Sequence, residues 1–328
     1  MIKRSSAACI LPCLALLVCH PGSADPEAMQ VQPLPAAGQY QAPAPGSLRV
    51  VLLGSGGGPP VRLDQFGMST LVEAEGTRLL FDCGRGATIR LTQLGVPIAS
   101  INRLFLTHLH SDHIIQIPDL ILAGWTTGRT LPIEVWGPDG TREMMDALQR
   151  AYAFDIHMRR DIDEKDSAEG IRVISQDIKE GTVFDRDGLK VTGFLVDHGP
   201  VSPAFGYRID YRGHSVLLSG DTRMSENLVR HATGVDVLVH EVTDAVAQRA
   251  TSKNLPRTEA IIAHHTTPEQ AGQIFSRVKP RLAVYSHAPA TLAVIEQTRK
   301  TYSGPLQGAE DLLTIDIGDQ ITVRHFGS

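Results

Sequence analysis

Short apolar runs recur along the chain from Leu48 onward, and each is bounded by residues that favour turns. Runs of four to eight residues rich in Val, Ile, Leu and Phe are typical of buried strands. The pattern predicts strands at Leu48–Leu53, Thr70–Glu75, Arg78–Asp82, Arg103–Thr107, Ile133–Trp136, Leu189–Val196, Phe205–Tyr211, Ser215–Ser219, Val235–His240, Leu282–Ser286, Leu312–Ile315 and Gln320–His325.

Segments with helical spacing of apolar residues lie between these strands. Helices are expected at Thr88–Leu94, Ile114–Ala123, Thr141–Tyr152, Asn227–Ala232, Asp244–Thr251, Pro268–Val278 and Ala290–Thr301. One start is well marked, because Thr267 can be the N-cap, Pro268 fits the first helical position and Gln270 stands at the capping-box position. Strands interspersed with helices predict an α/β fold, and a single domain is the simplest interpretation.

The first 24 residues have the pattern of a secretory signal peptide. Lys3 and Arg4 precede an apolar run from Ala7 to Cys19, and Gly22–Ala24 supply small residues for cleavage. The run is shorter than the roughly 20 residues that span a bilayer, so no stable membrane anchor is expected. A periplasmic or secreted protein is therefore predicted. Lipidation at Cys19 is an alternative, although Val18 is bulky where a lipoprotein signal has a small residue.

Residues 25–46 are rich in Pro, Ala and Gln and have little apolar periodicity. This composition predicts a linker or extended arm. The remaining domain is expected to span residues 47–328. Cys83 is the one cysteine outside the predicted signal peptide, so no intramolecular disulfide is expected. Without the signal peptide, 29 basic residues stand against 36 acidic ones, a formal charge of −7 that disfavours a general nucleic-acid binder.

The segment Thr107–His113 contains four candidate metal ligands within six residues and follows a predicted strand. Residues two apart in an extended segment point the same way, so His108 and His110 can share one ion. Asp112 and His113 then face a second ion, as in hydrolases whose two ions lie roughly 3.5–4 Å apart. The alternative is a polar turn whose histidines cap a helix that begins near Asp112. The strand-then-helix context favours the metal site.

This pattern resembles the His-x-His-x-Asp-His signature of the metallo-β-lactamase superfamily. The resemblance implies a four-layer αββα sandwich of the metallo-β-lactamase type, and it supplies the strand order, which periodicity does not. Two groups of strands with interspersed helices suit that architecture.

Three further candidate ligands stand directly after predicted strands. His198 follows Leu189–Val196, Asp221 follows Ser215–Ser219 and His287 follows Leu282–Ser286. Each alone fits an ordinary polar loop, but their joint occurrence after the opening motif favours a metal centre. The carboxylate of Asp221 can bridge two cations and offset charge that imidazoles cannot.

Two ligand sets follow from these positions. One ion is assigned His108, His110, His198 and Asp221, and the other is assigned Asp112, His113, His287 and Asp221. Zinc is the first choice for such a nitrogen-rich set, with manganese or iron as alternatives. A hydroxide that bridges the two divalent ions is the expected nucleophile.

Within the superfamily, the chain resembles most the ribonuclease Z and arylsulfatase-like branch, through Leu53–Gly56, His240–Thr243 and His265–Thr267. The resemblance implies that His265 is a general acid oriented by Glu241, and both are expected to be catalytic together with Asp112. The alternatives are a buried ion pair for Glu241 and a helix-flanking polar residue for His265.

The Gly-rich segment Gly54–Pro60 could cradle a phosphate, but it lacks the Lys-Ser/Thr ending of a P-loop. We expect it to be a tight turn that passes near the metal site. Trp125, Thr126 and Met144–Arg160 are expected to shape the substrate pocket.

The features together predict an exported dinuclear metallohydrolase acting on a small-molecule phosphodiester or sulfate ester. Lactone or β-lactam hydrolysis is a second hypothesis. The resemblance argues against a β-lactamase, because it implies that typical β-lactamases lack a bridging carboxylate like Asp221. A ribonuclease Z-like endoribonuclease is a third hypothesis. Such an enzyme needs a basic arm that binds tRNA, whereas Asp155–Glu180 holds five basic and eight acidic residues, so tRNA is disfavoured as the substrate.

A non-catalytic metal-binding protein that kept the fold is the fourth reading. It predicts missing ligands, yet all seven positions carry ligand residues. The family resemblance also implies a homodimer.

Overall fold

The computed structural model of the chain describes residues 40–288 and 291–326, which belong to one compact unit that spans Pro35–Ser328. The predicted signal peptide and most of the predicted linker lie outside the described residues. The described helices include none that is both long and apolar enough to cross a bilayer.

The first sheet has eight strands in the order β15-β14-β1-β2-β3-β4-β5-β6. Its strands are β1 Leu48–Gly54, β2 Ser69–Ala74, β3 Thr77–Phe81, β4 Arg103–Phe105, β5 Ile133–Gly137, β6 Val173–Asp177, β14 Leu313–Ile317 and β15 Ile321–Arg324. Strands β3 to β6 run parallel, whereas β15, β14, β1, β2 and β3 pair antiparallel.

The second sheet has seven strands in the order β13-β12-β11-β10-β9-β8-β7. They are β7 Gly181–Arg186, β8 Leu189–His198, β9 Val201–Tyr211, β10 His214–Leu218, β11 Val237–Glu241, β12 Leu282–Ser286 and β13 Leu306–Gln307. Strands β10 to β13 run parallel, and β7 to β10 form antiparallel hairpins.

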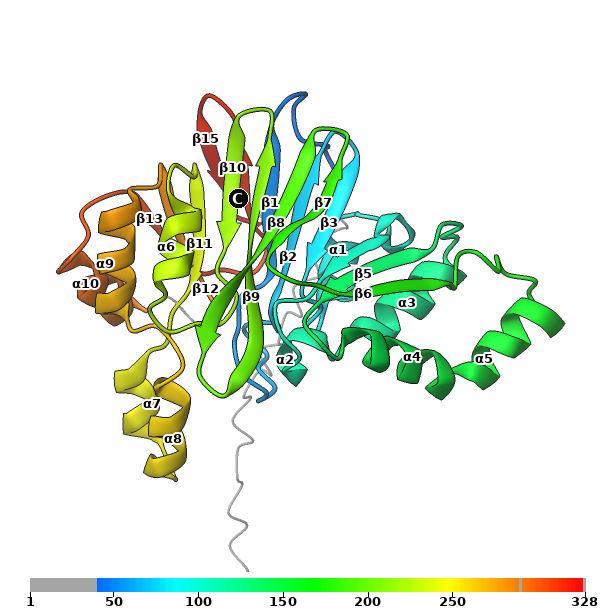
Figure 1. Cartoon of the computed structure of the whole chain (residues 1–328), viewed down its shortest axis with the longest axis horizontal. Coiled ribbons are helices and arrows are strands. Elements are labelled where there is room, and N and C mark those ends of the chain that lie inside the picture. Colours follow the sequence, from blue (N-terminus) through cyan, green and yellow to red (C-terminus); the bar gives the residue numbers. More distant parts are fainter. Residues whose placement is uncertain (1–39, 289–290, 327–328) are drawn as a thin grey trace, which may run out of the picture. The chain divides into compact units, whose positions relative to one another are not determined.

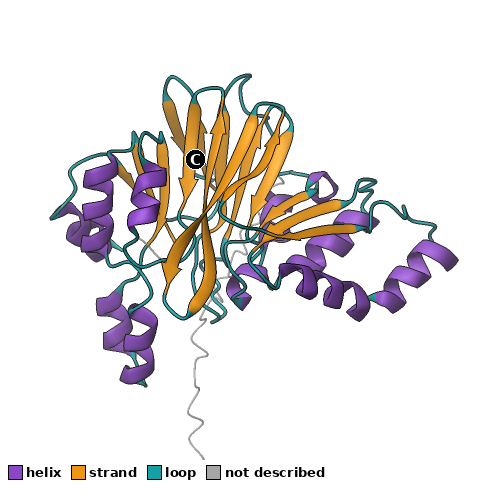
Figure 2. Ribbon diagram, viewed as in Figure 1, coloured by secondary structure: helices purple, strands orange, loops and turns teal. Residues whose placement is uncertain are grey.

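Helices cover the outer faces of both sheets (Figures 1 and 2). They are α1 Ala87–Gln93, α2 Ser111–Ile114, α3 Ile117–Thr126, α4 Thr141–Ala151, α5 Ala153–His157, α6 Glu226–Ala232, α7 Ala245–Thr251, α8 Leu255–Ile262, α9 Pro268–Val278 and α10 Leu292–Arg299, with a 3-10 turn at Ile98–Ser100 and a π-helical turn at Met158–Ile162. Helices α1, α3 and α4 pack on the first sheet, and α6, α9 and α10 pack on the second.

Strand β1 shows why the apolar runs are continuous. Val50 and Leu52 face the core between the two sheets, whereas Val51 and Leu53 face the core under α1 and α3. A strand buried on both faces has no polar face, so the sequence does not alternate. The expected four-layer αββα metallo-β-lactamase-type sandwich is therefore confirmed.

Most of the predicted elements are present, and the predicted helix start at Thr267 is confirmed. The Thr267 hydroxyl accepts from the Gln270 backbone N–H, and Gln270 Oε1 accepts from the Thr267 backbone N–H at 3.0 Å. The end of the predicted linker lies on the domain, because the Tyr40 hydroxyl donates to Glu73 Oε1 at 2.7 Å.

Several elements lack the patterns that predict them. Strands β6 and β7 are half exposed and carry polar residues, so the sequence pattern does not predict them as strands. Helix α8 is exposed on most of its surface and therefore has a weak apolar stripe. Arg129 is buried and has no carboxylate partner within residues 40–288 and 291–326; its guanidinium donates instead to the backbone carbonyls of Ile101, Leu120, Ile121 and Gly170.

Candidate metal centre

The candidate ligands gather at the carboxyl ends of the strands. The motif Thr107–His113 follows β4, His198 ends β8, Asp221 follows β10, and His287 follows β12. β8, β10 and β12 end at the same edge of the second sheet, and the motif after β4 of the first sheet meets their side chains there. The alternative, a polar turn with capping histidines, does not fit, because the N-cap residue His110 makes no side-chain cap hydrogen bond.

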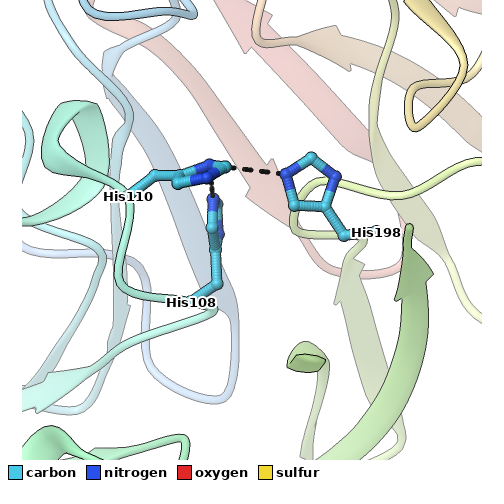
Figure 3. A group of neighbouring side chains, drawn as sticks. All are labelled: His108, His110 and His198. Carbon is cyan, nitrogen blue, oxygen red and sulfur yellow. Dashed lines mark hydrogen bonds between the residues drawn. The ribbon is translucent and has the colours of Figure 1, made fainter. Parts of the chain in front are cut away.

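Three imidazoles form the first ligand group (Figure 3). His110 Nδ1 lies 3.0 Å from His108 Nε2 and 3.4 Å from His198 Nε2. Asp221 Oδ2 lies 3.8 Å from His108 Nε2 and 3.9 Å from His198 Nε2. Nitrogens this close around one point are suited to coordinating a single ion.

The second ligand group lies on the other side of Asp221. His113 Nε2 lies 3.6 Å from Asp112 Oδ2 and 3.4 Å from Asp221 Oδ1. His287 Nε2 lies 3.5 Å from Asp112 Oδ2 and 3.0 Å from Asp221 Oδ2. Asp221 therefore contacts imidazoles of both groups, and the structure brings the seven predicted ligands close together.

Unsatisfied polar atoms indicate that these groups fit metal ions. His113 Nε2, Asp221 Oδ1 and His287 Nε2 are buried and, despite their mutual proximity, none makes a hydrogen bond of good geometry among the described residues. Buried polar atoms without partners are costly, and coordination to a cation would satisfy all three. Nitrogen and carboxylate donors of this kind suit divalent transition metals.

Asp82 supports the motif from beneath and was not predicted as a site residue. Its carboxylate accepts from the backbone N–H and hydroxyl of Thr107, both at 2.8 Å, and lies 2.7 Å from His113 Nδ1. A carboxylate on the far nitrogen fixes the tautomer and orientation of a ligand imidazole. The available signal was its position directly after β3, which resembles the positions of the candidate ligands after their strands.

The Gly-rich turn passes beside the second ligand group, as expected. The Gly58 N–H donates to Asp112 Oδ2 at 2.8 Å. A Cβ at Gly57 would lie 2.2 Å from the His287 carbonyl oxygen and 2.4 Å from His287 Nδ1. Only glycine fits this approach. His287 itself has φ of 67°, a left-handed conformation that is uncommon outside glycine and often marks a functional site.

The ionisation of the ligands reflects their proximity. Burial lowers the pKa of His287, but the carboxylates of Asp221 and Asp112 outweigh it and raise that pKa to about 10. Burial raises the pKa of Asp112, but His287 and His113 outweigh it and hold that pKa well below its usual range. In the first group, burial lowers the pKa of His108, with the neighbouring His113 acting in the same direction.

Glu241 and His265 form a hydrogen-bonded pair beside the ligands. Glu241 Oε1 lies 3.0 Å from His265 Nδ1 and also accepts from the backbone N–H groups of Thr222 and Thr266. The His265 ring stacks on the His287 ring with centroids 5.1 Å apart. Burial lowers the pKa of His265, but the Glu241 carboxylate outweighs burial and the pKa is raised overall.

A cavity of about 300 Å³ opens onto the centre. Its lining residues are Gly57, Gly58, Pro59, His110, Ser111, Asp112, His198, Asp221, Thr243, Gln248, Arg257, Ile261, His264, His265 and His287. The expected contributions of Trp125, Thr126 and Met144–Arg160 are wrong, because none of them lines this cavity and the Trp125 side chain is 1% exposed in the core. Helices α7 and α8 form the wall instead.

Two further histidines, His240 and His264, lie beside the ligand residues and were not predicted as ligands. The His198 Nδ1 lies 3.1 Å from the His264 carbonyl oxygen, which orients the His198 ring. His240 is fully buried, with its Nδ1 at 2.6 Å from the Glu241 carbonyl oxygen. Away from the site, ring nitrogens of His157, His231 and His325 lie 2.9, 3.4 and 2.6 Å from carboxylate oxygens of Asp161, Glu180 and Glu310.

The sequence is similar to a known protein family and to curated relatives. Residues 77–288 match the family model described as a beta-lactamase superfamily domain. The chain is 33% identical over 285 residues to a ribonuclease Z of Mycobacterium marinum, covering 82% of this chain and 99% of the relative. A ribonuclease Z of Mycobacterium avium is 34% identical over 283 residues, covering 82% and 98%.

Solved structures have the same fold at lower sequence identity. The metallo-beta-lactamase fold protein YhfI from Bacillus subtilis superposes with a TM-score of 0.64 at 19% identity, covering 83% of this chain and all of that one. The short form of human tRNase Z superposes with a TM-score of 0.61 at 22% identity, covering 81% and 98%. The chain therefore belongs to the metallo-β-lactamase superfamily, as a ribonuclease Z-like member of the fold's hydrolases.

Proposed function

We propose that the protein is a dinuclear metal-dependent phosphodiesterase. The observation that carries the proposal is the position of Asp221, whose carboxylate contacts imidazoles of both ligand groups beside a cavity that His265 also lines. When bound, two divalent ions would supply an activated water and electrophilic stabilisation of the phosphoryl oxygens. Zinc is the first candidate, because five of the seven ligands are imidazoles.

The residues of the chain divide the remaining work. His108, His110 and His198 would hold one ion, Asp112, His113 and His287 would hold the other, and Asp221 would join the two. His265 would hold a proton at Nε2 and give it to the leaving oxygen, because its Nδ1 is engaged by Glu241. Glu241 is a positioning residue whose carboxylate is fixed by two backbone N–H groups.

RNA cleavage is the second candidate function. It is favoured by relatives named ribonuclease Z that match this chain over nearly their whole length. Against it stands the segment of residues 155–180, where basic side chains are already paired. Arg159 contacts Asp155 and Glu164 at 3.0 and 2.7 Å, and Lys179 contacts Asp139 at 3.0 Å. Paired charges are less available to phosphates. We therefore propose a small diester as substrate, with export through residues 1–24 separating the protein from precursor tRNA.

Turnover assays test the proposal directly. Zinc-loaded protein is expected to hydrolyse bis-p-nitrophenyl phosphate. His110→Ala is expected to lose at least 100-fold in kcat/KM, because it lacks one of the metal ligands. Wild-type turnover no faster than that of His110→Ala would overturn the proposal. Preferred turnover of an aryl sulfate, nitrocefin, an acyl-homoserine lactone or a precursor tRNA would instead assign the site to that substrate.

A further inference from the structure

Helices α7 and α8 form a fixed wall of the cavity. Arg249 on α7 makes two hydrogen bonds to the Glu259 carboxylate on α8, at 2.6 and 2.9 Å. Between the helices, the Ser252 and Thr258 hydroxyls lie 2.7 Å apart, and the Asn254 side chain caps α8. The two helices project together as a hairpin (Figure 1). These contacts order the hairpin, so the residues that it contributes to the cavity have defined positions.

Three hairpin residues line the cavity: Gln248, Arg257 and Ile261. The Gln248 amide donates to the Thr243 hydroxyl at 2.8 Å, which fixes one side of the wall. Arg257 is the one Lys or Arg among the residues that line this cavity. Its guanidinium has no hydrogen-bond or ion-pair partner within residues 40–288 and 291–326, whereas the neighbouring Arg249 is paired with Glu259. The free positive charge of the cavity wall therefore lies on Arg257.

The charges of the cavity are unevenly distributed. The carboxylates that line it, Asp112 and Asp221, both belong to the ligand groups, where ions would neutralise them together with the reacting phosphodiester. His265 lines the cavity as well, but its imidazole is paired with Glu241, so a further anionic group on the substrate would find its unpaired cation in Arg257. A guanidinium binds phosphate through paired, charge-assisted hydrogen bonds and is the preferred residue for that task.

We propose that Arg257 is a specificity residue for substrates in which the phosphodiester carries a second phosphate on one of its alcohol groups. This inference rests on the proposed phosphodiesterase function and names the substrate class of the same site. Arg257 acts in binding and takes no part in bond cleavage. Its removal is therefore expected to change the preference between substrates and leave the chemical step on a singly charged diester unchanged.

Two chromogenic esters that differ in one phosphate test the proposal. They are thymidine 5′-(p-nitrophenyl phosphate) and the same ester with an added 3′-phosphate. Zinc-loaded wild-type protein is expected to prefer the 3′-phosphorylated ester. Arg257→Gln is expected to lower kcat/KM for that ester by about tenfold or more, mainly through KM, with less than a twofold change for the unphosphorylated ester. Arg257→Lys should restore part of the preference.

Lys253→Gln is the matched control, because Lys253 is exposed in the same hairpin but does not line the cavity. It removes the same charge, so an equal loss in Lys253→Gln and Arg257→Gln would overturn the proposal in favour of long-range attraction. An unchanged substrate preference in Arg257→Gln would also overturn it.

A binding measurement separates this inference from the proposed function. Titration calorimetry would compare thymidine 3′,5′-bisphosphate with thymidine 5′-monophosphate on zinc-loaded wild-type protein and on Arg257→Gln. Tighter binding of the bisphosphate that is lost in the variant supports the role of Arg257 even if neither ester is hydrolysed, a result that would refute only the phosphodiesterase activity. Equal affinities in both proteins refute the role of Arg257 whatever the turnover.

Discussion

Glu241 Oε1 lies 3.0 Å from His265 Nδ1, and the same oxygen accepts from two backbone N–H groups. The two backbone N–H groups therefore fix the carboxylate, and the carboxylate orients the imidazole. Its other oxygen, Oε2, is buried without a hydrogen-bond partner among the described residues. An oriented imidazole at the wall of a metal-site cavity is the arrangement that general acid catalysis requires.

Replacing Glu241 by Gln should lower the pKa of His265. Burial lowers that pKa in the native protein, and the Glu241 charge overcomes burial and raises it. Without the charge, His265 loses its proton at lower pH, so the alkaline limb of the kcat profile on bis-p-nitrophenyl phosphate should move to lower pH. The rate at neutral pH should fall by about 10- to 100-fold, within the range for general acid catalysis.

His265→Ala distinguishes this role from a structural one. It should lose about 10²- to 10⁴-fold in kcat while keeping both ions, and its alkaline limb should disappear. Metal content is read by elemental analysis of the purified variants. Loss of metal in either variant, or an unchanged alkaline limb in Glu241→Gln, would contradict general acid catalysis by His265.

Asp82→Asn should weaken metal binding although Asp82 is not itself a ligand. The amide keeps the shape of the side chain but removes the charge that orients His113 through a 2.7 Å contact. Loss of such a supporting carboxylate typically costs 10- to 100-fold in metal affinity. Competition with a chelator measures the affinity. Asp236→Asn is the control, because Asp236 accepts from a strand backbone N–H in the same way but lies away from the site. Equal affinities in wild-type protein and Asp82→Asn would refute the supporting role.

The ligand positions could be predicted from the sequence, because each follows an apolar run that forms a buried strand. His198, Asp221 and His287 are separated by up to 89 residues, yet strands that end at one edge bring them together. Strand order was not predictable from these local patterns. It depends on which strands pair, and it was supplied by the resemblance of the motif to a known family.

The supporting residues and the cavity wall were less predictable. Aspartate is common in the turns that follow strands, so the role of Asp82 is revealed by its contacts with Thr107 and His113. Arg257 lies in helix α8, whose apolar pattern is weak because most of its side chains are exposed. Trp125 was expected to shape the cavity, but its side chain is buried elsewhere and its indole N–H donates to the Ser167 carbonyl.

The metal-free protein should lose stability as the pH rises through about 10. The folded-state pKa of His287 is raised from 6.5 to about 10, since Asp221 and Asp112 outweigh the effect of burial. A raised pKa stabilises the folded state fully below the unfolded value near 6.5, and this contribution is lost as the pH approaches and passes about 10. Binding of a divalent ion displaces the same proton, so metal affinity should rise over this range.

Urea unfolding of chelator-treated protein at several pH values measures the effect. His287→Gln keeps every other titrating group, so the difference in unfolding free energy between the two proteins isolates the His287 contribution. That difference should shrink between pH 7 and pH 10. A difference that stays constant or grows over this range would show that the imidazole is neutral in the metal-free protein.

Gly57→Ala should damage the second ligand group without unfolding the domain. The added Cβ would lie 2.2 Å from the His287 carbonyl oxygen and 2.4 Å from its Nδ1, so His287 or the turn must move. Overpacking of this kind costs about 1–3 kcal/mol, which here falls on the position of one ligand. We expect weaker binding of one of the two ions and at least a tenfold loss of kcat. Gly318→Ala is the matched control, because its Cβ meets only the Gln320 carbonyl oxygen, at 3.7 Å. Full metal content and activity in Gly57→Ala would mean that the turn yields instead of His287, and that the close approach of the glycine has no part in holding the ligand.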